Sequence, residues 1–303
     1  MTEYSDQRYL HAKRTVDDRA LNRGVLDVLH ASLSELGERP VRILEIGAGV
    51  GTMLSRLGDW GVLRRTDYVL LDRDATSLAS ARAHLEGWAD SVTTAGEVLT
   101  VKKAALEARA SFVAEEAFAF MAAASASARF DLVVANAVLD LMELEPVLRA
   151  IWGVLKPAGR FWFSINFDGD TIFEPESPLD EAVMRLYHRS MDERMRDGRP
   201  AGHSKTGRRL LTAIGATGAD LCAAGSSDWV VFPRARGYAG DEAYFLRHIV
   251  HTIDEALSGH RELDAAQFAT WVAERFGQIE RGELCYIAHQ LDVFGIAPKG
   301  VPG

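Results

Sequence analysis

The stretch Leu44-Glu45-Ile46-Gly47-Ala48-Gly49-Val50-Gly51-Thr52 decides the fold of this chain. Its first residues belong to an apolar run, 41–46, that predicts a strand, and a helical pattern begins at Met53. Glycines at such a junction let the backbone turn sharply and approach a ligand closely. The helix that follows presents free N–H groups and the positive end of its dipole to the loop. The stretch therefore predicts a strand–loop–helix unit that binds a nucleotide-like cofactor.

Strand and helix patterns alternate outward from this unit. Apolar runs predict strands at 68–72, 111–113, 131–135 and 160–165, and helical patterns cover 17–36, 75–85, 118–124 and 146–155. The second half is mostly helical, with two more strands expected within 219–232 and at 284–288. Alternation of this kind is typical of a parallel sheet with right-handed crossovers. We therefore expect an α/β fold, with a seven-stranded, mostly parallel sheet and helices on both faces.

The chain divides into three segments without a second autonomous core. Residues 1–36 are expected to form an N-terminal helical arm, and residues 37–169 the cofactor-binding core. Within the core, Ala95-Gly96 between two alternating runs predicts a hairpin insertion at about 91–110. Residues 170–303 carry lid helices, the last core strands and a helical insertion at 233–283. We expect the arm and the 170–205 segment to close over the ligand pocket.

Composition and charge narrow the class of partner. The 303 residues are 48% hydrophobic and 25% charged, which are ordinary values for a globular protein. Because 34 Lys and Arg stand against 43 Asp and Glu, the net charge is −9, and the field of the whole chain disfavours nucleic acid and anionic membranes. We see no apolar run long enough to span a membrane and no secretory signal in the charged first 22 residues. Cys222 and Cys285 lie too far apart for a metal motif, so we expect a cytoplasmic protein without a metal.

The spacing of the glycines distinguishes between cofactor classes. The dinucleotide fingerprint G-x-G-x-x-G would place its last glycine at Thr52, whereas here it comes one residue early, at Gly51. This disfavours a nicotinamide-dependent oxidoreductase. Asp72 ends the second predicted strand, where a carboxylate can accept hydrogen bonds from both ribose hydroxyls.

These residues resemble the motifs of class I S-adenosylmethionine-dependent methyltransferases. Glu45 with the three glycines resembles the first motif of that family, and Asp72 resembles its second. The segment 116–118 fits the position that contacts adenine, and 136–139 fits the loop beside the methionine moiety. The turn at 155–160 looks like the one before the fifth strand. The hairpin at 91–110 and the insertion at 233–283 depart from the family pattern.

The resemblance implies a Rossmann-like sheet, a helical lid and S-adenosylmethionine as the methyl donor. The cofactor-binding residues that it implies are Glu45, Gly47, Ala48, Gly49, Gly51, Asp72, Arg73, Glu116, Ala117, Asn136 and Ala137. A homologue that binds S-adenosylmethionine without catalysing a reaction stays an alternative.

Candidate catalytic residues lie near the carboxyl edge of the predicted sheet. Methyl transfer from a sulfonium mainly requires alignment, and a base is needed only if the acceptor has a proton to lose. Asn136, Asp140, Asn166, Asp168 and Asp170 are polar residues at this edge. Glu174 stands among apolar neighbours, where desolvation would raise its pKa and suit it to proton abstraction. His188 and His203 are the alternative bases.

An enclosed small molecule is the expected acceptor. Candidate substrate-binding residues are Lys13, Arg14, Tyr187, Arg208, Tyr244 and His248. Basic residues near His203 and Arg208 could form an anion cradle, which would suit C-methylation of an isoprenoid diphosphate, with Mg²⁺ only in that case. O- or N-methylation of a specialised metabolite is the alternative. The run after Asn136 lacks the Pro-Pro-aromatic element that amino-methylating nucleic-acid enzymes use. The sequence leaves the oligomeric state open, a homo-oligomer included.

Overall fold

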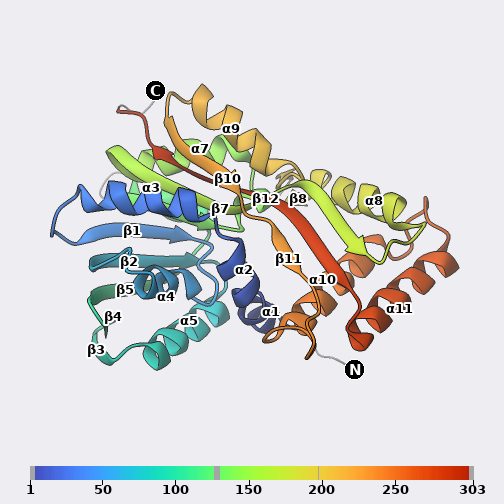
Figure 1. Cartoon of the computed structure of the whole chain (residues 1–303). Helices are drawn as coiled ribbons and strands as arrows, with labels where there is room; N and C mark the ends of the chain where they lie inside the picture. Colours follow the sequence, from blue (N-terminus) through green and yellow to red (C-terminus); the bar gives the residue numbers. More distant parts are fainter. Residues whose placement is uncertain (1–3, 126–129, 197, 300–303) are drawn as a thin grey trace.

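The computed structural model describes residues 4–125, 130–196 and 198–299, and its centre is one mixed sheet (Figure 1). The order of strands in this sheet is β10-β12-β7-β6-β1-β2-β5-β4-β3, and β11 pairs with β12. The parallel part consists of β5 (Leu106–Ala114), β2 (Arg65–Asp72), β1 (Val41–Ile46), β6 (Phe130–Asn136) and the first half of β7 (Leu155–Glu174). Beyond β7 the sheet continues with antiparallel strands. These are β12 (Cys285–Ile296), which pairs with β7, and β10 (Asp220–Ser226) and β11 (Trp229–Val231), which pair with β12. The predicted α/β class with a mostly parallel Rossmann-like core is confirmed, but the sheet has ten strands among the described residues instead of the expected seven, because antiparallel strands extend both of its edges.

Helices cover both faces of the sheet because neighbouring residues of a strand point to opposite sides. On β1, Ile43 packs in one hydrophobic cluster and Leu44 in the other. In the first cluster, buried residues of α3 (Arg23–Ser34), α4 (Thr52–Asp59) and α5 (Ala75–Trp88) pack on one face of the sheet. In the second cluster, buried residues of α6 (Ala117–Ala124), α7 (Leu144–Val154) and α9 (Thr206–Ala216) pack on the other face. Strands buried on both faces read as continuous apolar runs, which is why 41–46 and 131–135 stand out in the sequence.

The edge beyond β5 holds the predicted hairpin. It consists of β3 (Ser91–Ala95) and β4 (Val98–Lys103), with Gly96 in the left-handed region at φ 60°. The third core strand is longer than expected, since β5 begins at Leu106 and pairs with β2 on one side and β4 on the other.

The predicted single helix 17–36 is wrong, because the chain breaks it at Leu21 and Asn22. The structure has α1 (Asp6–Ala12), α2 (Arg14–Ala20) and α3 instead. Asn22 has an extended backbone, and its side chain accepts a hydrogen bond from the Val25 amide at 3.0 Å, which caps α3. The Asn22 amide itself donates to the buried Asp292 carboxylate on β12. A long-range contact therefore fixes the point where the arm turns.

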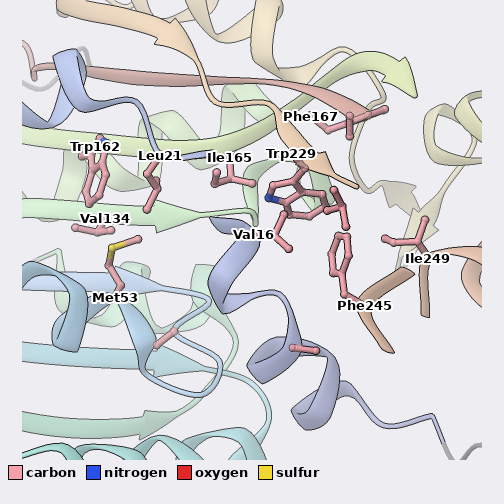
Figure 2. Packing of buried hydrophobic residues seen from close by; sticks show 14 of the residues in the cluster. Val16, Leu21, Met53, Val134, Trp162, Ile165, Phe167, Trp229, Phe245 and Ile249 are labelled. Carbon is pink, nitrogen blue, oxygen red and sulfur yellow. The ribbon is translucent and has the colours of Figure 1, made fainter. Parts of the chain in front are cut away.

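Strands β7 and β12 continue together well beyond the parallel part of the sheet (Figure 1). Their far end packs with α8 (Asp180–Asp192), α10 (Glu242–Leu257) and α11 (Ala265–Arg281), and the short pair β8 (Met195–Arg196) and β9 (Arg199–Pro200) lies between α8 and α9 in the chain. Figure 2 shows Trp229 of β11 beside Val16 of α2 and Phe245 of α10, and the two aromatic rings meet edge to face at 5.2 Å. The arm and the helical insertion therefore share one core with the sheet. No helix among the described residues is long and apolar enough to cross a membrane.

Candidate functional site

A cavity of about 490 Å³ opens at the carboxyl ends of β1, β2, β6 and β7. Chain connections leave β1 and β6 toward opposite sides of the sheet, and such a switch point is where open α/β sheets bind ligands. One half of the cavity, the outer chamber, is walled by the glycine loop and by the residues after β2, β5 and β6. The other half, the inner chamber, is walled by α1, α8, α10 and the extended parts of β7 and β12.

The glycine loop makes the sharp turn that its sequence predicts, with positive φ at Gly47, Gly49 and Gly51. Gly47 has φ 67°, and a Cβ there would stand 2.8 Å from a methyl group of Val138. Gly51 has φ 72°, and a Cβ there would stand 2.9 Å from the Ala81 side chain. Gly47 and Gly49 line the cavity, whereas Ala48 and Gly51 pack behind it. Gly47 therefore forms part of the cavity wall, whereas Gly51 allows the loop to pack closely against α5.

Asp72 lies at the cavity wall and also holds the loop in place. Its Oδ2 accepts a hydrogen bond from the Gly49 amide at 2.8 Å, and its Oδ1 accepts one from the Asp74 amide at 3.0 Å. A carboxylate has about four acceptor positions, so two amides leave room for two hydroxyl donors. Asp74 caps α5, and hydrogen bonds from Ser77 and from the Thr76 amide lower its pKa to about 2. Arg73 lies exposed at the cavity rim.

The predicted adenine and methionine positions also line the cavity. Glu116 caps α6 by accepting hydrogen bonds from the Phe118 and Ala119 amides at 2.7 and 3.2 Å, and Ala117 lies beside it. Asn136 accepts a hydrogen bond from the Ser164 hydroxyl at 2.9 Å. Ala137 has φ 54°, in the left-handed region, and its neighbour Val138 lies against Gly47.

Glu45 lies beneath the loop, not at the cavity. It is 2% exposed, and the Tyr68 hydroxyl donates a hydrogen bond to its Oε2 at 2.9 Å. Burial raises its pKa to about 8, against the lowering effects of Tyr68 and Arg56. The structure therefore places this motif residue in the support of the loop.

Replacing Glu45 by glutamine should flatten the dependence of stability on pH. The ordinary carboxyl pKa of 4.5 applies to the unfolded chain, and about 8 to the folded one, so between these values only the folded state keeps the proton. The free energy of unfolding then falls as pH rises, by up to about 1.4 kcal/mol per pH unit. Glutamine keeps the acceptor for Tyr68 without titrating. Urea unfolding between about pH 5 and pH 8 measures the free energy of unfolding of both proteins. That of the variant should rise relative to that of the wild-type protein as pH rises. A difference that does not change with pH would contradict the raised pKa of Glu45.

The inner chamber gathers polar groups on largely apolar walls. Tyr9 of α1, Tyr187 of α8 and Tyr286 of β12 line it, together with Asp140 and Gln290. Burial raises the pKa of Tyr187 to about 12, and it raises the pKa of Asp140 against the opposing charges of Arg194 and Lys13. Burial raises the pKa of Tyr9 well above its ordinary value, and the nearby Tyr286, Asp17, Tyr187 and Asp140 groups raise it further.

Three of the predicted substrate-binding residues line the cavity and three do not. Lys13, Tyr187 and His248 are in its wall. Arg14 instead forms ion pairs with Asp18 and Asp59. The Tyr244 hydroxyl accepts a hydrogen bond from the Ser5 amide, and the Arg8 guanidinium stacks on its ring. Arg208 lies outside the cavity as well.

The expected anion cradle is not assembled. Arg208 binds the Asp168 carboxylate through Nε at 2.9 and 3.0 Å and donates to the Asp168 carbonyl, so its charge is already compensated. Arg209 is exposed on α9. His203 lies 3.2 Å from Asp192, and neither residue belongs to the cavity wall.

The prediction of Glu174 as a buried base is wrong. Glu174 is exposed at the end of β7, where it pairs with Cys285, and it does not line the cavity. The sequence suggests a loop beyond the fifth strand, but β7 continues to this residue, and its alternation turns Phe173 inward and Glu174 outward. His188 lies behind the wall, with its Nε2 3.1 Å from the Thr171 hydroxyl. Burial lowers the pKa of His188.

Sequence reasoning missed several groups of the inner chamber. Tyr9, Tyr286 and Gln290 come from segments that carry no motif. Asp140 is one of the polar residues at the predicted sheet edge, four positions after Asn136, but nothing in the sequence distinguishes it from the other polar residues there as a catalytic base. Within 4–125, 130–196 and 198–299, no group of three or more His, Cys, Asp or Glu side chains could hold a metal ion.

Residues 44–161 match the family model of a methyltransferase domain. No curated protein matches the chain. Among solved structures, phosphoethanolamine N-methyltransferase 2 of Haemonchus contortus is 13% identical and has a TM-score of 0.42 over 97% of this chain and 58% of its own. The protein YJHP of E. coli is 15% identical, with a TM-score of 0.44 over 97% of this chain and 99% of its own. The chain thus spans only 58% of the length of the Haemonchus protein.

Proposed function

We propose that this chain, which is a class I S-adenosylmethionine-dependent methyltransferase with its methyltransferase domain at residues 44–161, methylates a compact small molecule held in the inner chamber. The observation that carries the proposal is the continuity of the cavity. Its outer chamber has the glycine loop and the Asp72 carboxylate, and its inner chamber has a separate set of polar side chains. Donor and acceptor can therefore meet in one enclosure.

The residues of the outer chamber fit the donor. Gly47 and Gly49 line the wall with positive φ, where a Cβ would crowd the Val138 or Leu10 side chain, and Asp72 keeps acceptor positions for ribose hydroxyls. When bound, S-adenosylmethionine supplies an electrophilic methyl group on a sulfonium. Asn136, held by Ser164, and the backbone at Ala137 lie where the family motif contacts the methionine moiety.

The residues of the inner chamber orient the acceptor and receive its proton. Asp140 comes from the short helix η1 (Leu139–Leu141) directly after the β6 loop, so it lies next to the donor half of the cavity. Because burial raises its pKa, its carboxylate is more basic than an exposed aspartate. We assign Asp140, in place of Glu174, as the base for an acceptor that has a proton to lose.

Replacing Asp72 by alanine should weaken the binding of S-adenosylmethionine and S-adenosylhomocysteine at least tenfold. Hydrogen bonds to a charged group contribute about 1.5–3 kcal/mol each, and the variant loses two acceptor oxygens. Isothermal titration calorimetry measures the affinity, and a thermal unfolding scan verifies the fold. Asp67→Ala is the matched control, because Asp67 lies on the same strand, outside the cavity, in an exposed pair with Arg109. Equal affinity of the Asp72 variant and the wild-type protein would contradict the donor assignment.

A further inference from the structure

Three residues that line the inner chamber have a buried polar side-chain atom with no hydrogen-bond partner among the described residues: Asp140, Gln290 and His248, the last at its Nδ1. Asp140 Oδ1 and Gln290 Oε1 are both buried and accept no hydrogen bond from any described residue. The Gln290 side chain comes from β12 and the residue is 1% exposed, whereas Asp140 comes from η1; both residues line the chamber. A buried acceptor left unpaired is costly, so groups of this kind are normally satisfied. A ligand that presents at least two N–H or O–H donors would satisfy both.

Charged side chains of both signs line the inner chamber, and Asp140 differs from the others in having a buried carboxylate oxygen without a partner among the described residues. Lys13 also lines the cavity, but its ammonium lies 3.2 Å from the buried Asp17 carboxylate, so it is already compensated. Arg194 and Arg196, in the segment that follows α8, also line the cavity, and the charge of Arg194 opposes the raised pKa of Asp140, but both side chains are exposed to solvent. Asp6 is exposed on α1 and is acidic as well. An anionic acceptor would therefore meet a buried carboxylate at the depth of the chamber, and a cationic one would be stabilised by it.

Five aromatic side chains contribute to the remaining wall, among aliphatic residues. Tyr9, Tyr187, Tyr286, Phe167 and Trp229 contribute rings from α1, α8, β12, β7 and β11. The Tyr9 ring is held in place by stacking on His248, with ring centroids 4.2 Å apart. Ring faces attract ammonium groups, most strongly where water is excluded.

We propose that the acceptor is a primary or secondary amine that enters as an ammonium ion and donates its N–H groups to Asp140 and Gln290. The aromatic walls hold its charge, and this assignment rests on the function proposed above. An ammonium nitrogen has no lone pair, so one proton must leave before methylation. Asp140 takes that proton, which leaves a neutral amine and a neutral carboxyl group. The amine lone pair then forms the new bond to the methyl carbon as the methyl–sulfur bond breaks, with the electron pair kept by sulfur.

Matched sets of small ligands test this assignment. With S-adenosylhomocysteine saturating, calorimetry compares propylamine, phenethylamine and tryptamine with the alcohol and the carboxylate of each skeleton. Phenethyl trimethylammonium, which keeps the charge but has no N–H donor, separates the two contributions. At least one amine should bind about tenfold more tightly than its alcohol and its carboxylate, and its trimethylated form should be weaker. Asp140→Asn should remove the preference, and Asp170→Asn, an exposed carboxylate outside the cavity, should retain it.

The outcomes separate the two proposals. If S-adenosylhomocysteine does not bind the wild-type protein, the proposed function fails and the amine assignment falls with it. If S-adenosylhomocysteine binds but no amine exceeds its alcohol and carboxylate, the amine assignment alone is overturned. A preference that survives Asp140→Asn also overturns it, since the charge would then come from elsewhere.

Discussion

Replacing Asp140 by asparagine is expected to lower the rate of methyl transfer by about 10²–10⁴-fold, the usual contribution of a general base. Asparagine keeps the size of the side chain and one acceptor oxygen but cannot take a proton. Asp140 lines the inner chamber, whereas Asp72 and the glycine loop lie in the outer one, so the affinity for S-adenosylmethionine should stay within about twofold. The measurement is the turnover of methyl-labelled donor with the amine that binds best.

The control for this variant is a carboxylate of the same sheet edge that does not reach the cavity. Asp170 is exposed on β7, only a few residues from the chamber wall, and Asp170→Asn should retain the rate. A pH profile gives a second readout: loss of the base should remove the acidic limb of the rate, since protonation of Asp140 no longer matters. An Asp140→Asn enzyme with an unchanged rate would show that alignment alone drives the reaction.

Replacing Asp17 by alanine is expected to destabilise the fold by about 3–5 kcal/mol, the usual cost of breaking a buried ion pair. Asp17 is 1% exposed, and its Oδ2 lies 3.2 Å from the Lys13 ammonium and 3.5 Å from the Arg56 guanidinium. Its Oδ1 accepts a hydrogen bond from the Trp229 indole at 2.9 Å. The variant would leave two buried cations without this partner and one indole N–H unpaired. Urea unfolding, monitored by tryptophan fluorescence, measures the loss.

Asp27→Ala is the matched control, because Asp27 is exposed on the next helix, α3. It should change the free energy of unfolding by less than about 0.5 kcal/mol. A loss below about 1 kcal/mol for Asp17→Ala would show that the cluster is not essential to the fold. Since Asp17 links the arm to α4 and β11, its variant should also weaken donor binding, whereas the control should not.

The sequence by itself determined the glycine-loop half of the cavity, which we propose binds the donor. Strand β1, the glycine loop and Asp72 lie within one stretch of chain, and their tasks follow from local physics. Continuous apolar runs mark strands buried on both faces, and Gly47 and Gly51 occur where positive φ and close neighbours exclude a side chain. The carboxylate at the end of β2 needs only the parallel order of two strands to reach the loop.

Only the tertiary structure decided the acceptor side. Glu174 faces outward because β12 pairs with β7 up to its last residue, and that pairing joins segments far apart in the sequence. Arg208 is compensated because α9 brings it to Asp168, and Lys13 is compensated by Asp17. Asp140 and Gln290 become a pair of unpartnered acceptors only when η1 and β12 close the same chamber. Burial and pairing decide which charged side chains can act on a ligand, and both depend on contacts that no local pattern records.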